Sequence, residues 1–76
     1  MSDHHQRLVR MANQIAGFMR SRPPGLAADG LAGHVNDFWN PRMRGQLLDL
    51  IAAGDAGLDA LVVDARDRIR PPPLEG

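Results

Sequence analysis

Apolar residues recur every three or four positions along most of the chain, a spacing that indicates amphipathic helices rather than strands. Segments rich in proline or glycine separate these stretches, because such residues interrupt helices and favour turns. The expected fold is all-α, a small bundle of three to four short helices in a single domain over residues 1–76. The predicted helices span about residues 3–20, 28–39, 41–53 and 60–69, and the tail 71–76 is expected to be extended or disordered.

The first predicted helix has a wide apolar face. With about 100° of rotation per residue, the face covers roughly half of the circumference, whereas a stripe of about 100° suffices to cover one core. This width predicts packing against two neighbours within the chain, which we favour over a dedicated binding face. The residues on the face are Leu8, Met11, Ala12, Ile15, Ala16, Phe18 and Met19, with Val9 at its margin.

The second predicted helix has a narrower apolar stripe. Leu31, Val35 and Phe38 recur at the spacing of one helix face. Phe38 is therefore expected in the core, whereas His34 and Trp39 flank the stripe.

The last two predicted helices also have one apolar stripe each. Gly54 is expected to end the third helix in a left-handed conformation, and Asp59 is expected to cap the fourth. Leu48 falls outside the stripe of the third helix, on the same side as Arg44. The inner residues are Met43, Leu47, Leu50 and Ile51 in the third helix and Leu61, Val62, Ala65 and Ile69 in the fourth.

The segment Asn36–Arg44 joins the second and third helices and contains the only tryptophan of the chain. A residue before proline disfavours helical geometry, so Asn40 should end one helix and cap the next, which Pro41 opens. Arg42 and Arg44 then stand in a first helical turn, where the helix dipole disfavours cations by roughly 0.3–1 kcal/mol each. Without visible compensation, this placement indicates either a contact outside the chain or two solvated arginines.

Length and composition limit what the chain can do alone. A domain of 76 residues buries only about 60% of the surface that its unfolded chain exposes, so its core is small. The sequence contains no cysteine, which excludes disulfides and thiolate zinc sites. We therefore expect a partner to stabilise it, either a second copy or a larger protein.

Charge and hydropathy narrow the class of partner. Nine arginines balance nine acidic residues, whereas a nucleic-acid-binding domain usually has a basic excess. No segment reaches the roughly 20 apolar residues that span a bilayer, and the polar start lacks the apolar region of a signal peptide. We expect a cytoplasmic protein with neither a nucleic acid nor a membrane as its partner.

Catalytic chemistry is poorly represented in the sequence. The glycines are scattered through turns and form no phosphate-binding loop. Ser2 and Ser21 are the only serines and there is no threonine, which disfavours a hydroxyl nucleophile. Asp64 and Asp67 share a helix face and are expected to be solvated. We expect no catalytic, metal-binding or cofactor-binding residue in this chain.

Four stretches resemble the delta subunit family of NAD-dependent, molybdenum-containing formate dehydrogenases. The resemblance covers about residues 8–70, and its most specific part is the tryptophan-to-arginine corner. One departure is Ala60, where many relatives are expected to have proline. The four stretches are Leu8–Ala16, His34–Trp39, Pro41–Arg44 with Gln46 and Leu47, and Gly57–Asp59.

The resemblance implies a small noncatalytic subunit of a cytoplasmic complex. In such a complex the large alpha subunit holds the bis-molybdopterin guanine dinucleotide and iron–sulfur clusters. Beta and gamma subunits carry flavin and further clusters and pass electrons to NAD. The delta subunit is implied to bind the alpha subunit and to help it acquire or keep its molybdenum cofactor.

The corner between the second and third helices is the partner-binding surface expected from the sequence. Arginine and tryptophan are frequent interface hot spots. Two alternatives remain open: a transient chaperone whose corner arginines bind molybdopterin guanine dinucleotide, and a small helical DNA-binding regulator, whose zero net charge predicts weak binding. The residues expected to dock the partner are Asn36, Trp39, Pro41, Arg42, Arg44 and Leu48.

Overall fold

The computed structural model describes residues 3–73 and is entirely helical in its regular structure. This confirms the predicted all-α class for the described residues. The elements are the α-helices α1 (Asp3–Met19), α2 (Pro24–Phe38), α3 (Pro41–Ala52) and α4 (Ala60–Asp64), and the 3-10 helix η1 (Arg66–Arg68).

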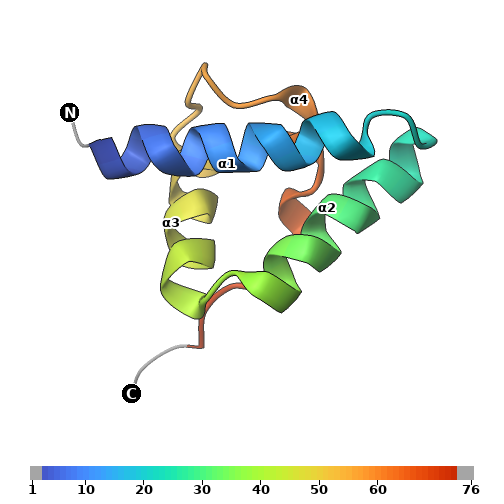
Figure 1. Cartoon of the computed structure of the whole chain (residues 1–76). Coiled ribbons are helices and arrows are strands. Elements are labelled where there is room, and N and C mark those ends of the chain that lie inside the picture. Colours follow the sequence, from blue (N-terminus) through green and yellow to red (C-terminus); the bar gives the residue numbers. More distant parts are fainter. Residues whose placement is uncertain (1–2, 74–76) are drawn as a thin grey trace.

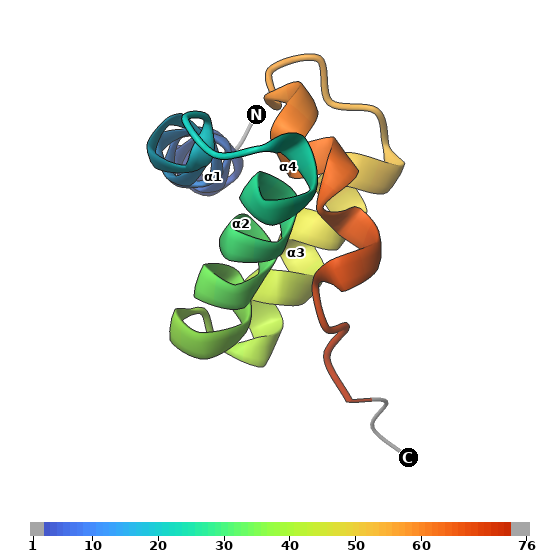
Figure 2. The ribbon, with the colours of Figure 1, turned by 90° about the vertical axis from the view of Figure 1, so that its right-hand side faces the viewer.

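The helices α1, α2 and α3 form three sides of an open triangle (Figure 1). α1 packs against α2, α3 and α4, while α2 also packs against α4 and η1. The turned view places α1 on one side of α2 and the segment from α4 onward on the other (Figure 2). Within residues 3–73, no helix combines the length and hydrophobicity needed to cross a membrane.

Three predicted helix ends are confirmed because they depend on local chemistry. The side chain of Asn40 accepts a hydrogen bond of 2.8 Å from the backbone N–H of Met43 at the start of α3. Gly54 has a φ of +74° just after that helix. Asp59 accepts a hydrogen bond of 2.9 Å from the backbone N–H of Leu61 at the start of α4.

The start of α2 differs from the prediction, because the helix begins at Pro24 rather than near residue 28. Proline suits a first helical turn, where its missing N–H is not needed, and the carbonyl of Pro23 accepts from Ala27 at 2.8 Å. Gly30 lies inside the helix and allows close packing there, since a Cβ at Gly30 would lie 2.8 Å from the sulfur of Met19.

The predicted length of the last helix, residues 60–69, is also wrong. α4 ends at Asp64, and the chain continues through η1 to Ile69, which has extended backbone angles (φ −83°, ψ 125°). This break allows the chain to run past α2 while Ile69 remains buried. Residues 70–73 form neither helix nor strand, and the rest of the predicted tail, 74–76, lies outside the described residues.

The core is small and rich in alanine, which lets the helices approach closely. The predicted inner residues of α3, α4 and the segment that follows are confirmed as buried or partly buried. Leu48, predicted on the outer side of α3, packs against the core instead. The buried cluster contains Leu8, Ala12, Ala16, Ala28, Leu31, Ala32, Val35, Trp39, Leu47, Ile51, Val62, Ala65 and Ile69.

The aromatic residues are where the predicted core is wrong. Phe38 is 75% exposed, whereas its neighbour Trp39 is only 6% exposed. α2 ends at Phe38, and the extended backbone of Trp39 (φ −93°, ψ 138°) departs from the helical rotation, so the indole turns inward. Phe18 lies at the edge of the wide face of α1 and is 83% exposed.

Candidate functional site

The six residues predicted to dock a partner do not form one open surface. Pro41 and Arg42 are exposed, and for these two a docking role stays a prediction. The other four contact the rest of the chain: Trp39 is in the core, Leu48 packs against it, and Asn36 and Arg44 hold backbone groups.

Asn36 ties α2 to the segment that follows η1. Its Nδ2 donates to the carbonyl of Arg68 at 3.0 Å, and its Oδ1 accepts from the backbone N–H of Arg70 at 2.8 Å. One side chain therefore satisfies two backbone groups that have left the helical pattern.

Arg44 ties the corner to the same segment. Its Nε donates to the carbonyl of Arg70, and its Nη1 donates to the carbonyl of Trp39, each at 3.0 Å. These bonds offset the unfavourable position of a cation at the start of α3. The groups that compensate the charge of Arg44 are thus backbone carbonyls of the chain itself. The position of Arg44 is therefore no longer an argument for a contact with another protein.

Asn13 makes a similar pair of bonds at the other end of the molecule. Its Nδ2 donates to the carbonyl of Gly57 and its Oδ1 accepts from the N–H of Asp59, both at 2.8 Å. Asp59 also pairs with Arg20 at the end of α1. The hydrogen bond from the backbone of Leu61 and the nearby guanidinium lower the pKa of Asp59, although partial burial opposes them.

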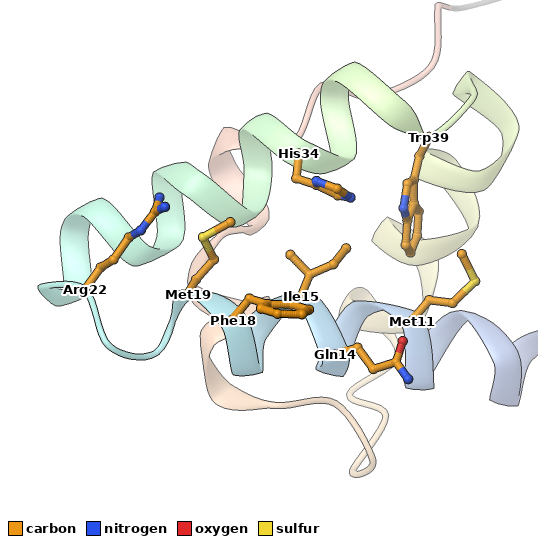
Figure 3. Close-up of a pocket in the computed structure, with 8 residues that line it drawn as sticks. All are labelled: Met11, Gln14, Ile15, Phe18, Met19, Arg22, His34 and Trp39. Carbon is orange, nitrogen blue, oxygen red and sulfur yellow. The ribbon is translucent and has the colours of Figure 1, made fainter.

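A groove lies between α1 and α2. It encloses about 560 Å³. Side chains from both helices point into it: Met11 and Ile15 rise from α1, and His34 and Trp39 face them from the side of α2 (Figure 3). The residues that line it are Met11, Gln14, Ile15, Phe18, Met19, Arg22, His34 and Trp39.

Two exposed phenylalanines lie in this groove or next to it. Phe18 lines the groove from α1. Phe38 is not a lining residue, but its ring contacts the ring of His34, which lines the α2 side, with 4.8 Å between ring centroids. Large apolar side chains that are this exposed and adjoin an apolar groove are typical of interaction sites.

The lining of the groove is mainly apolar. Its polar lining residues are Gln14, Arg22 and His34, and no carboxylate lines it. In the described part of the chain, no cluster of three or more histidine, aspartate or glutamate residues could hold a metal ion. Burial of apolar surface is the interaction that these side chains favour.

Comparison with known protein families identifies the family of this chain. Residues 7–66 match the family model of the NADH-dependent formate dehydrogenase delta subunit, FdsD. The chain belongs to this family. A search of curated proteins finds no match.

The matched region includes all the residues that line the groove. The four stretches that resemble the FdsD family contact one another in the folded chain. Asn13 of the first stretch holds Gly57 and Asp59 of the fourth, and Arg44 of the third holds Trp39 of the second. These stretches therefore specify how the helices are joined.

Sequence reasoning missed the groove because it assigned Phe18 and Phe38 to the core. The signal that could have found it was the width of the apolar face on α1. The neighbouring helices cover Leu8, Ala12 and Ala16 completely. They leave Phe18 uncovered, so the face has room for one more neighbour.

Proposed function

We propose that the chain is a noncatalytic accessory subunit of a cytoplasmic formate dehydrogenase and that it binds the large alpha subunit. In this proposal the alpha subunit holds the bis-molybdopterin guanine dinucleotide centre and iron–sulfur clusters. Beta and gamma subunits of the same complex carry flavin and further clusters and deliver electrons to NAD. The chain itself binds none of these cofactors.

The observation that carries the proposal is the open groove between α1 and α2 in a chain of the delta subunit family. A domain of 76 residues buries only a small core, and this one leaves two phenylalanines 75% and 83% exposed. Covering such side chains with a partner is favourable by about 25 cal/mol per Å² of apolar area. A large subunit of the same enzyme is the partner that family membership favours.

Through this contact, the chain would help the alpha subunit to assemble or to retain its molybdenum cofactor. A subunit that only contributes apolar contacts can act through the stability of the protein it covers. Binding to the cofactor-loaded form in preference to the empty form would shift the alpha subunit toward the loaded state.

Co-expression of the tagged chain with the alpha subunit tests this proposal. Size-exclusion chromatography of the purified material should give a stoichiometric complex that contains molybdenum and oxidises formate. The matched control is the alpha subunit expressed without the chain, which should contain less molybdenum. Elution of fully active, molybdenum-loaded alpha subunit apart from the chain would contradict a permanent accessory subunit.

A further inference from the structure

We infer that the groove between α1 and α2 receives an amphipathic helix of the alpha subunit, and that this helix carries a carboxylate that pairs with Arg22. The inference rests on the proposed function and specifies its contact surface. It moves the main docking site from Pro41 and Arg42 at the corner to the groove that α1 and the C-terminal half of α2 line.

The shape of the groove favours a helix as its occupant. α1 and α2 are joined by the short loop after Met19 and diverge toward Trp39, so they form a V that is closed at one end (Figure 3). Two helices that diverge in this way leave room for the apolar face of a third, with anchor residues at helical spacing. Two of the lining residues, Met11 and Met19, have flexible side chains that can adapt to the shape of an inserted anchor.

The charge of the groove specifies the chemistry of that helix. Arg22 lines the closed end, with its Nη1 3.0 Å from the place that a Cβ on Gly30 would occupy. Two other arginines, Arg20 and Arg68, pair with Asp59 and Asp29, but among residues 3–73 no carboxylate pairs with Arg22.

The unpaired guanidinium of Arg22 is therefore available to an acidic partner. Guanidinium groups bind carboxylates through two parallel hydrogen bonds, which gives both affinity and orientation. An acidic residue beside the apolar anchors of the incoming helix would complement this end of the groove.

The same charge argues against a second copy of this chain as the occupant. A two-fold interface brings the same patch of both copies together. The only charged side chain lining the groove is Arg22, so a symmetric pair would offer no carboxylate to either guanidinium. A partner that supplies the missing acid is favoured.

Binding measurements on purified wild-type chain and variants with the purified alpha subunit test the inference. Phe18→Ser and Phe38→Ser should each weaken binding roughly thirty-fold, the effect of removing an interface hot spot. Arg22→Glu should weaken it at least about tenfold, because the partner's carboxylate would then face another acid. Circular dichroism spectra of these variants should match the wild type, since all three side chains are exposed.

Two matched variants control for loss of apolar surface and for loss of charge elsewhere. Val63→Ser removes an apolar side chain that is 46% exposed on α4, and Arg66→Glu reverses an exposed charge on η1. Both should bind within about twofold of the wild type, because neither residue lines the groove.

Photo-crosslinking identifies the occupant directly. With p-benzoylphenylalanine in place of Phe18, the crosslink should map to an amphipathic helix of the alpha subunit that contains an aspartate or glutamate. A crosslink to a second copy of the chain, or to a segment without an acidic residue, would overturn the inference.

The binding data separate the two levels of the argument. If wild-type chain binds the alpha subunit and the groove variants bind equally well, the inference fails while the proposed function stands. If the folded wild-type chain does not bind at all, the proposed function fails, and the inference fails with it.

Discussion

Two adjacent aromatic residues at the end of α2 should respond to truncation in opposite ways. Trp39→Ala removes a side chain that is 6% exposed and packs in the core, whereas Phe38→Ala removes one that is 75% exposed. The sequence pattern predicts the reverse, with Phe38 in the core and Trp39 available for docking. The two substitutions together therefore distinguish the observed packing, with Trp39 in the core, from the predicted packing, with Phe38 in the core.

The expected losses of stability differ severalfold. A buried tryptophan removes about 150–250 Å² from water, which at about 25 cal/mol per Å² corresponds to roughly 4–6 kcal/mol. Truncation of core aromatic residues to alanine typically costs about 3–5 kcal/mol. At about 0.05–0.15 kcal/mol per residue, a domain of this length has only about 4–11 kcal/mol in total, so Trp39→Ala should lose most of its stability.

Phe38→Ala should cost less than about 1 kcal/mol. Only a quarter of the side chain is buried, and alanine is the better helix former at the end of α2. Its melting temperature should stay within about 8 °C of the wild type, since 1 kcal/mol shifts a domain of this size by about 4–8 °C.

Urea and thermal unfolding followed by far-ultraviolet circular dichroism measure both variants. Dichroism is the suitable probe because Trp39→Ala removes the only tryptophan. A Trp39→Ala variant that unfolds at the wild-type midpoint would refute the packing described here. Equal destabilisation by the two substitutions would refute it as well.

Three further perturbations have defined outcomes. Arg44→Ala should lower the free energy of unfolding by about 1–3 kcal/mol, measured by urea denaturation, because two backbone carbonyls lose their donor. Gly30→Ala should keep or slightly raise the melting temperature, since alanine favours the helix and the contacting end of Met19 can move. The same substitution should weaken binding to the alpha subunit, because the side chains that must move, Met19 and Arg22, line the groove. The lowered pKa of Asp59 means that its ionised form stabilises the fold above the ordinary pKa of 3.8, and that this stability is lost as the pH falls through the lowered value. The urea midpoint should therefore fall more steeply on acidification in the wild type than in Asp59→Asn.

Features that depend on a few neighbouring residues could be predicted from the sequence. Asn40 and Asp59 cap their helices, and Gly54 ends α3, because each acts on backbone groups within three or four residues. The apolar stripes of α3 and α4 were predictable for the same reason, since helical rotation alone decides which residues share a face.

Features that depend on distant contacts could not be predicted. The partners of Asn36 lie more than 30 residues away, at Arg68 and Arg70, so no local pattern indicates them. The bonds of Arg44 to the corner and to the C-terminal segment depend in the same way on the folded chain. Without them the arginine looks uncompensated, and the corner is mistaken for the docking surface.

The candidate site was hidden by the assumption that every apolar face is covered within the chain. The apolar face of α1 is wide, but the neighbouring helices cover Ala12 and Ala16 and leave Phe18 open. The periodic pattern places Phe38 in the core, but Phe38 is the last residue of α2, and the pattern does not apply to Trp39 beyond it. Helical periodicity does not predict which residues are buried beyond the end of a helix.

Hydroxyl-radical footprinting of the wild-type chain, alone and in complex with the alpha subunit, tests the central claim most directly. The method reports the solvent exposure of individual side chains by their oxidation, and phenylalanine and methionine react readily. We predict strong protection of Phe18 and Phe38 in the complex and unchanged oxidation of Val63. Protection at Pro41 and Arg42, with Phe18 and Phe38 oxidised as in the free chain, would contradict the account and return the docking site to the corner.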